Sequence, residues 1–123
     1  MAGKRVPKSG GANVVVEISN AMVALHREYF GMGPSAAKSF VSEEMAVCVL
    51  SDIYTPVERT LIKSGQADHV RHTRGLHQEA LEGHYKTTVE EVLGCPVEAF
   101  LSVVHVEPDI AIEVFLLGAR PSA

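Results

Sequence analysis

Thr55, Glu58 and Arg59 place a hydroxyl, a carboxylate and a guanidinium within one short stretch, YTPVERTLIKSG. Groups of these types can activate a nucleophile or hold an anion. The same spacing also starts helices, because Thr55 suits an N-cap, Pro56 fits the first helical position, and Glu58 follows the cap by three residues. We therefore predict a structural capping box at Thr55, Pro56 and Glu58. Arg59 is not needed by the box and is left for solvent or a partner.

Histidines gather in the segment from His69 to His84 and raise the question of a metal site. His77 and His84 point in nearly the same helical direction, but they lie two turns apart, roughly 10 Å, which one ion does not span. Only His69 with His72, and Asp68 with His72, have the spacing of helical neighbours. These spacings supply only two or three ligands for one ion and no fourth, so we expect no metal site and no cofactor.

His77 and His84 also continue an apolar stripe on their helix, which is typical of core or interface histidines. Glu113 stands among apolar residues and needs a charged partner or an edge position. Arg71 or Arg74 could supply that partner. An enzyme hypothesis would combine His77, His84 and Glu113, but no nucleophile motif accompanies them and we assign no catalytic residue.

A second alternative is a regulatory domain that binds a small ligand or an anion. It would use the GMGP turn that follows the first helix, together with nearby basic side chains. The turn lacks the Lys-Ser/Thr pair of a phosphate loop and follows a helix rather than preceding one. The candidate contacts for a ligand or a partner are then Gly31, Gly33, Pro34, Arg27, Arg59, Arg71, Arg74, His77, His84 and Glu113.

Composition favours a soluble globular chain, with 46% apolar and 21% charged residues among 123. The formal charge is −4 although Lys4, Arg5 and Lys8 cluster near the N-terminus, so the remainder is more acidic still. An acidic body repels phosphate backbones, which argues against nucleic-acid binding. No apolar run approaches the roughly 20 residues of a membrane span, and no signal peptide is evident. We expect a cytoplasmic protein.

The two cysteines are too few and too far apart for a zinc ribbon or a disulfide framework. Cys48 lies in the apolar run MAVCVL, which predicts a buried and inert thiol. Cys95 stands between Gly94 and Pro96, and we expect it to be more exposed.

Apolar spacing predicts the elements that would position these residues. The segment 13–30 reads as an amphipathic helix closed by Gly31, with an apolar stripe of Val15, Ile18, Met22, Leu25 and Tyr29. AAKSFV and MAVCVLSDIY read as two strands joined by a tight turn. A short helix follows to Gly65, then a longer one over 68–93, which Gly94 and Pro96 end.

The last segment reads as a hairpin that turns at Pro108-Asp109. Pairing Val106 with Ala111 divides the apolar side chains between two faces: Leu101, Val103, Ile112, Val114 and Leu116 on one, and Phe100, Val104, Phe115 and Leu117 on the other. Helices in a chain this short can cover one such face well. The second apolar face therefore predicts a homodimer, in which a second copy covers it.

The predicted fold is α+β, a two-layer arrangement in which an antiparallel sheet of about four strands is covered by three helices, in the order α-β-β-α-α-β-β. Residues 1–12 are expected to form a flexible basic tail, 13–118 a single domain, and 119–123 a C-terminal tail.

The order of these motifs resembles the sodium-translocating system protein MpsC-like family, once classed as a domain of unknown function. The resemblance covers roughly residues 14–118 and rests on the GMGP turn, Thr55-Pro56-x-Glu58-Arg59 with Gly65, Val89-Glu90 with Gly94, and Asp109 through Phe115. It implies a small accessory or regulatory protein, peripheral to a membrane system that generates potential or handles sodium and inorganic carbon. The expected partners are a second copy and such a membrane-associated complex.

Overall fold

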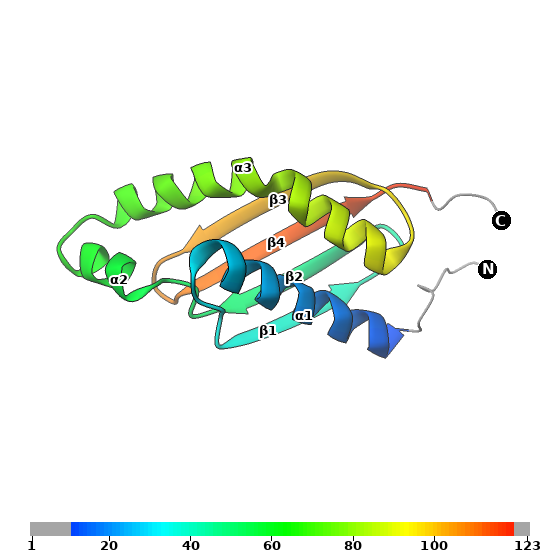
Figure 1. Ribbon diagram of the computed structural model, residues 1–123, viewed down its shortest axis with the longest axis horizontal. Helices are drawn as coiled ribbons and strands as arrows, with labels where there is room; N and C mark the ends of the chain where they lie inside the picture. The colour runs from blue at the N-terminus through cyan, green and yellow to red at the C-terminus, as the bar shows by residue number, and fades with distance from the viewer. Residues whose placement is uncertain (1–10, 120–123) are drawn as a thin grey trace.

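The fold is two-layered, with helices packed on one face of an antiparallel sheet (Figure 1). The computed structural model describes residues 11–119, with side chains from Asn13 onward. Its elements are α1 (Gly11–Phe30), β1 (Ala36–Val41), β2 (Met45–Ser51), α2 (Pro56–Lys63), α3 (Ala67–Leu93), β3 (Val97–His105) and β4 (Ile110–Leu117). The predicted α+β class and element order are confirmed. The basic tail residues Lys4, Arg5 and Lys8 lie outside the described residues.

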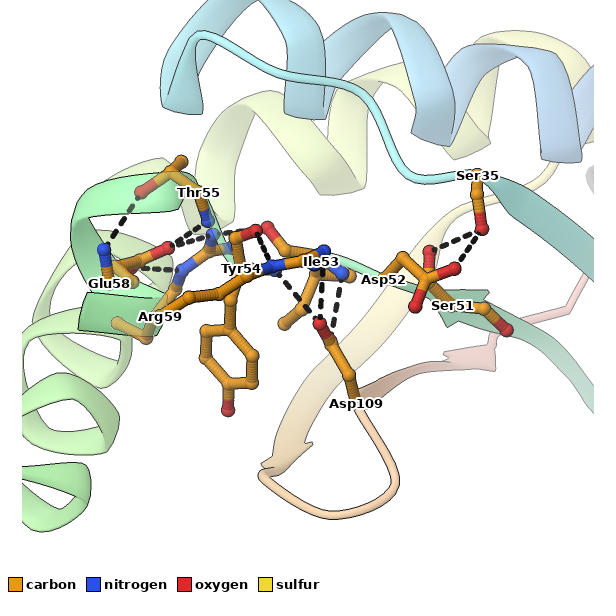
Figure 2. A network of polar contacts seen from close by, with 10 residues as sticks. Ser35, Ser51, Asp52, Ile53, Tyr54, Thr55, Glu58, Arg59 and Asp109 are labelled. Carbon is orange, nitrogen blue, oxygen red and sulfur yellow. Dashed lines mark hydrogen bonds and ion pairs between the residues drawn. The ribbon is translucent and has the colours of Figure 1, made fainter. Parts of the chain in front are cut away.

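The sheet has the strand order β1-β2-β4-β3, and every neighbouring pair is antiparallel. Helix α1 packs over β1 and β2, and α3 packs over β3 and against α1. The short α2 lies at one end of the layers and joins β2 to α3 (Figure 1). The β3–β4 loop reaches this same end, so two segments distant in sequence meet beside α2 (Figure 2).

Helix α1 buries one stripe against the sheet. Val14, Ile18 and Met22 have no exposed surface and Leu25 is buried, so the predicted stripe is confirmed except that Val14 takes the place of Val15. The helix ends at Gly31, whose φ of +80° is a conformation that glycine adopts without a Cβ clash.

Helix α3 buries a different stripe from the one that the sequence predicts. Its buried side chains are Val70, Arg74, Gln78, Tyr85, Val89 and Leu93. Periodicity alone favoured the more apolar neighbouring direction, which contains His77 and His84, and these two histidines are in fact exposed. The prediction was wrong because periodicity follows the apolar residues, whereas the stripe that is buried includes the polar residues Arg74 and Gln78, and Arg74 is paired with the carboxylate of Glu58.

Two strand boundaries differ from the prediction near Asp109. Strand β2 ends at Ser51 rather than Tyr54, because Asp52 takes a left-handed conformation with φ of 59° that breaks the ladder. In the hairpin Val104, not Val106, pairs with Ala111. Residues 106–109 form a wider turn, which frees Asp109 to bind the backbone beyond β2. A shift of two residues keeps each side chain on its predicted face.

The sheet face opposite the helices is apolar across all strands. We call it the open face and define it by side chains that share one side in the strand pairing: Lys38, Phe40, Met45, Val47, Val49, Leu101, Val103, Ile112, Val114 and Leu116. Phe40, Leu101 and Val103 are each more than half exposed. No described element covers this face.

Both cysteines are buried. The predicted burial of Cys48 is confirmed, and burial raises the pKa of its thiol to about 11, which supports an unreactive thiol. The expected exposure of Cys95 was wrong, since only 9% of its surface is exposed. It follows the end of α3 at Gly94 and precedes β3, where chain reversal turns it inward.

Candidate functional site

The start of α2 carries the predicted capping box. The Thr55 hydroxyl accepts from the backbone N–H of Glu58 at 3.3 Å, and the Glu58 carboxylate accepts from the backbone N–H of Thr55 at 2.8 Å. Pro56 occupies the first helical turn, where backbone N–H groups have no acceptor within the helix, so its missing N–H costs no hydrogen bond. The hydroxyl and the carboxylate are therefore engaged with the backbone, as the spacing predicted.

Arg74 of α3 binds the same carboxylate, that of Glu58, from the buried side. Its Nε and Nη2 each lie 2.7 Å from an oxygen of Glu58, and Nη2 also donates to the carbonyl of Ile53 at 2.6 Å. The ring of Phe30 lies 4.1 Å from the guanidinium carbon, which is a cation–π contact. The Arg74 side chain is only 1% exposed, so this bidentate pair joins α1, α2 and α3 at one point.

Glu58 is stabilised as a carboxylate by these partners. Burial raises its pKa, but the hydrogen bonds from Arg74 and from the backbone of Thr55 outweigh burial and lower the pKa overall. The charge on Glu58 is therefore part of the fold at neutral pH.

Arg59 faces the other side of α2 and contacts the β3–β4 loop (Figure 2). Its Nε donates to the carbonyl of Tyr54 at 3.0 Å, and its Nη2 lies 3.7 Å from Asp109. Asp109 in turn accepts from the backbone N–H groups of Ile53 and Tyr54, at 2.8 and 3.4 Å. Sequence reasoning missed Asp109 because the contact spans more than fifty residues. With about half of its side chain exposed, Arg59 is both a structural contact and a surface cation.

Glu113 lies in a buried polar cluster beneath the helices. Its Oε2 is 3.5 Å from Nε2 of His26, and neither side chain has any exposed surface. The predicted partners were wrong: Arg74 binds Glu58, and Arg71 binds Asp68 at the surface. Glu113 occupies the inner strand β4 and faces the helical layer, where His26 of α1 meets it.

Hydroxyls surround this pair. Ser102 stands opposite Glu113 in the strand pairing, and its oxygen, like that of Tyr85, is buried without a hydrogen-bond partner among the described residues. Burial, followed by the nearby charge of Glu113, raises the pKa of Tyr85 above its ordinary value. The cluster holds donors and acceptors in a dry setting, where each unpaired group is costly.

The remaining candidate residues lie apart from one another. His77 stacks on Phe30 and His84 on Tyr29, at centroid distances of 5.4 and 5.3 Å. No described contact joins these exposed histidines to the buried Glu113. Gly33 lies beside the Arg27 side chain, while Gly31 ends α1 and Pro34 follows it. Within residues 11–119 no group of histidine, cysteine, aspartate or glutamate side chains could hold a metal ion.

Comparison with known protein families now gives a decisive match. The family model described as Na⁺-translocating membrane potential-generating system (MpsC) matches residues 12–119. The chain belongs to the MpsC family. The predicted resemblance is thereby confirmed, and the match covers every helix and strand from α1 to β4 almost in full.

The family description associates MpsC proteins with a membrane system that moves Na⁺ and generates potential. In the part of this MpsC chain that the structure describes, no helix is both long enough and apolar enough to span a membrane. Neither a curated protein nor a solved structure matches the chain.

Proposed function

We propose that this MpsC protein is a non-catalytic accessory component of the Na⁺-translocating system and acts as a homodimer at the cytoplasmic side of the membrane. The open face carries this proposal. An exposed sheet face made of valine, leucine, isoleucine, phenylalanine and methionine side chains is typical of a contact surface rather than of one that faces solvent. Full burial of an exposed large aliphatic side chain contributes about 1.5–3 kcal/mol, and these side chains, which are at most 55% exposed, would each gain part of that.

A second copy is the occupant that best fits this face. Lys38 lies on the edge strand β1, and His105, which shares this side of the sheet, lies at the end of the edge strand β3, so the centre offers no charge that would select an unlike partner. A twofold axis through the face brings apolar side chains against apolar side chains of equal extent. The family description, rather than the face, supports attachment to the membrane system.

The non-catalytic role is supported by how the polar groups of α2 are used. Thr55 and Glu58, which suggested a nucleophile and its base, bind backbone N–H groups, and Arg74 binds the carboxylate. Their arrangement explains a helix start and the joining of three helices.

Light scattering tests the dimer. The wild-type chain should show twice the chain mass of 13.2 kDa at micromolar concentration. Ile112→Lys places a charge at the centre of the open face, between Val49 and Val103, and should give a folded monomer. Leu76→Lys, at an apolar residue on α3 that is 52% exposed, should stay dimeric. A monodisperse wild-type monomer would overturn the homodimer.

The accessory role has a separate test. A tagged chain, expressed in its native cells, should retain subunits of the Na⁺-translocating system when membranes are gently solubilised, as identified by mass spectrometry. Recovery of the tagged chain alone would contradict that role and leave the dimer unaffected.

A further inference from the structure

A cavity of about 490 Å³ lies beside α2, at the end of the molecule where the β3–β4 loop arrives. Its lining residues are Asp52, Tyr54, Arg59, Ile62, Lys63, Val106, Glu107, Pro108 and Asp109. The other two cavities described are much smaller, about 180 and 190 Å³. The volume falls in the range of small-molecule sites, about 300–1,000 Å³.

The cavity has an apolar wall. Ile62 comes from α2, and Val106 and Pro108 come from the loop opposite it. The ring of Tyr54 adds to this wall, and Figure 2 shows it turned away from the polar network, on the side of the loop. A ligand with an apolar body can therefore pack between α2 and the loop.

Three side chains of the lining have hydrogen-bond donors that no described contact uses. Tyr54 is 1% exposed, and its hydroxyl has no hydrogen-bond partner among the described residues. Burial, and then the charge of Asp109, raises the Tyr54 pKa, so the hydroxyl stays protonated at neutral pH. Arg59 uses Nε and one Nη in the contacts described above, and a guanidinium has five N–H donors in all. Lys63 is exposed and forms no ion pair within residues 11–119.

The carboxylates of the lining are largely engaged elsewhere. Asp109 binds two backbone N–H groups and Arg59, and Asp52 accepts a hydrogen bond from Ser35. Glu107 is exposed on the loop. Glu107 has no described partner, so one carboxylate of the lining also stays free. The other groups free to bind are a hydroxyl donor and two cations, and their complement is an anion with more than one acceptor oxygen.

We propose that this cavity binds a small organic carboxylate, whose oxygens accept from Tyr54, Arg59 and Lys63 and whose apolar body packs against Ile62, Val106 and Pro108. The site is built from two segments that only the fold brings together. It goes beyond the homodimeric accessory role, because ligand binding here needs no second copy.

Three probes separate the parts of this proposal. Butyrate carries the carboxylate and an apolar body, butyramide has the same shape without the charge, and acetate has the charge with almost no body. NMR titration of the ¹⁵N-labelled full chain should show saturable shifts for butyrate, centred on residues 52–63 and 106–109. Butyramide and acetate should bind more weakly, each lacking one of the two contributions. Shifts centred elsewhere, or none at tens of millimolar butyrate, would overturn the proposal.

Inorganic phosphate tests whether the apolar body matters. Phosphate should bind more weakly than butyrate, because it cannot use the wall of Ile62, Val106 and Pro108. Equal or tighter phosphate binding would replace the organic carboxylate with a simple anion and overturn the assignment.

Two pairs of variants assign the donors. Tyr54→Phe removes one buried unpartnered hydroxyl, and Tyr85→Phe removes another in the core as a matched control. Both should keep their melting temperature, but only Tyr54→Phe should weaken butyrate binding, by about tenfold. Lys63→Gln should weaken binding several-fold, while Lys86→Gln, which removes a lysine that pairs with Glu82 on α3, should not. Equal effects within either pair would overturn the assigned contacts.

Discussion

His26 and Glu113 face each other across the two layers, with 3.5 Å between Nε2 and Oε2 and no exposed surface on either side chain. One comes from the C-terminal part of α1 and the other from the inner strand β4. Transfer of an isolated charge to such a setting costs several kcal/mol unless a partner compensates it. The pair therefore ties the register of α1 on the sheet to a specific residue.

Removing one member of this pair should be far worse than removing both. Glu113→Ala should lower the free energy of unfolding by about 3–5 kcal/mol, since the buried His26 loses the carboxylate beside it and a cavity opens. The double variant His26→Leu with Glu113→Leu should cost less than either single change, because an apolar pair needs no partner. Urea unfolding of the wild type, His26→Leu, Glu113→Leu and the double variant measures this coupling. Additive losses in the double variant would contradict the pairing.

Glu58 should make stability fall in acid. Its pKa in the folded state is below the ordinary value of 4.5, so the folded state takes up a proton less readily than the unfolded chain. Its stabilisation is complete above that value and is lost as pH falls through the folded-state pKa. Glu58→Gln should be less stable at pH 7 and should lose less stability on acidification, as followed by thermal unfolding.

The control for that measurement is Glu79→Gln. Glu79 is exposed on α3 and has no described ion pair, so this variant should keep the wild-type stability and its acid dependence. A Glu58→Gln protein with the wild-type acid profile would show that the carboxylate contributes nothing through its charge.

Replacing either of two helical glycines with alanine should increase the stability of the protein. A Cβ at Gly75 or Gly83, both inside α3, meets nothing within 4 Å. Gly75→Ala and Gly83→Ala should each raise the free energy of unfolding by about 0.5–1 kcal/mol through helix propensity. Gly65→Ala should lower it instead, because its φ of +89° disfavours any Cβ. Thermal unfolding compares the three, and stabilisation by Gly65→Ala would contradict the left-handed turn after α2.

Cys48 should be unreactive until the chain unfolds. Its burial and its pKa of about 11 leave almost no thiolate at neutral pH. In a Cys95→Ser protein, a thiol reagent should label Cys48 slowly in buffer and completely in denaturant. Labelling in buffer at the rate of a free cysteine would mean that β2 is not covered by α1.

Exposed apolar side chains of the open face should contribute to dimer stability. Val103→Thr and Leu101→Thr replace side chains that are 55% and 54% exposed while keeping residues that strands accept. Each should weaken the proposed dimer, and static light scattering should show dissociation at a higher protein concentration than for the wild type. The chain should stay folded, as circular dichroism would show, because neither residue packs in the core.

Local spacing determined the elements and the start of α2. The Thr55–Glu58 box, the glycine ends at Gly31 and Gly94, and the alternation in β3 and β4 depend on contacts within a few residues, and all were predicted correctly. The family was also determined at this level, since its motifs are the same turns and caps.

Tertiary structure alone decided the partners of the charged residues. Arg74 could have met Glu113, but α2 lies against α3 and gives it Glu58, so His26 is left to face Glu113. Asp109 was read as one half of a tight turn, whereas its carboxylate holds the backbone after β2 and contacts Arg59. Sequence periodicity reports which way a side chain points along its own element. Which charge meets it depends on how separate elements pack, and that requires the assembled layers.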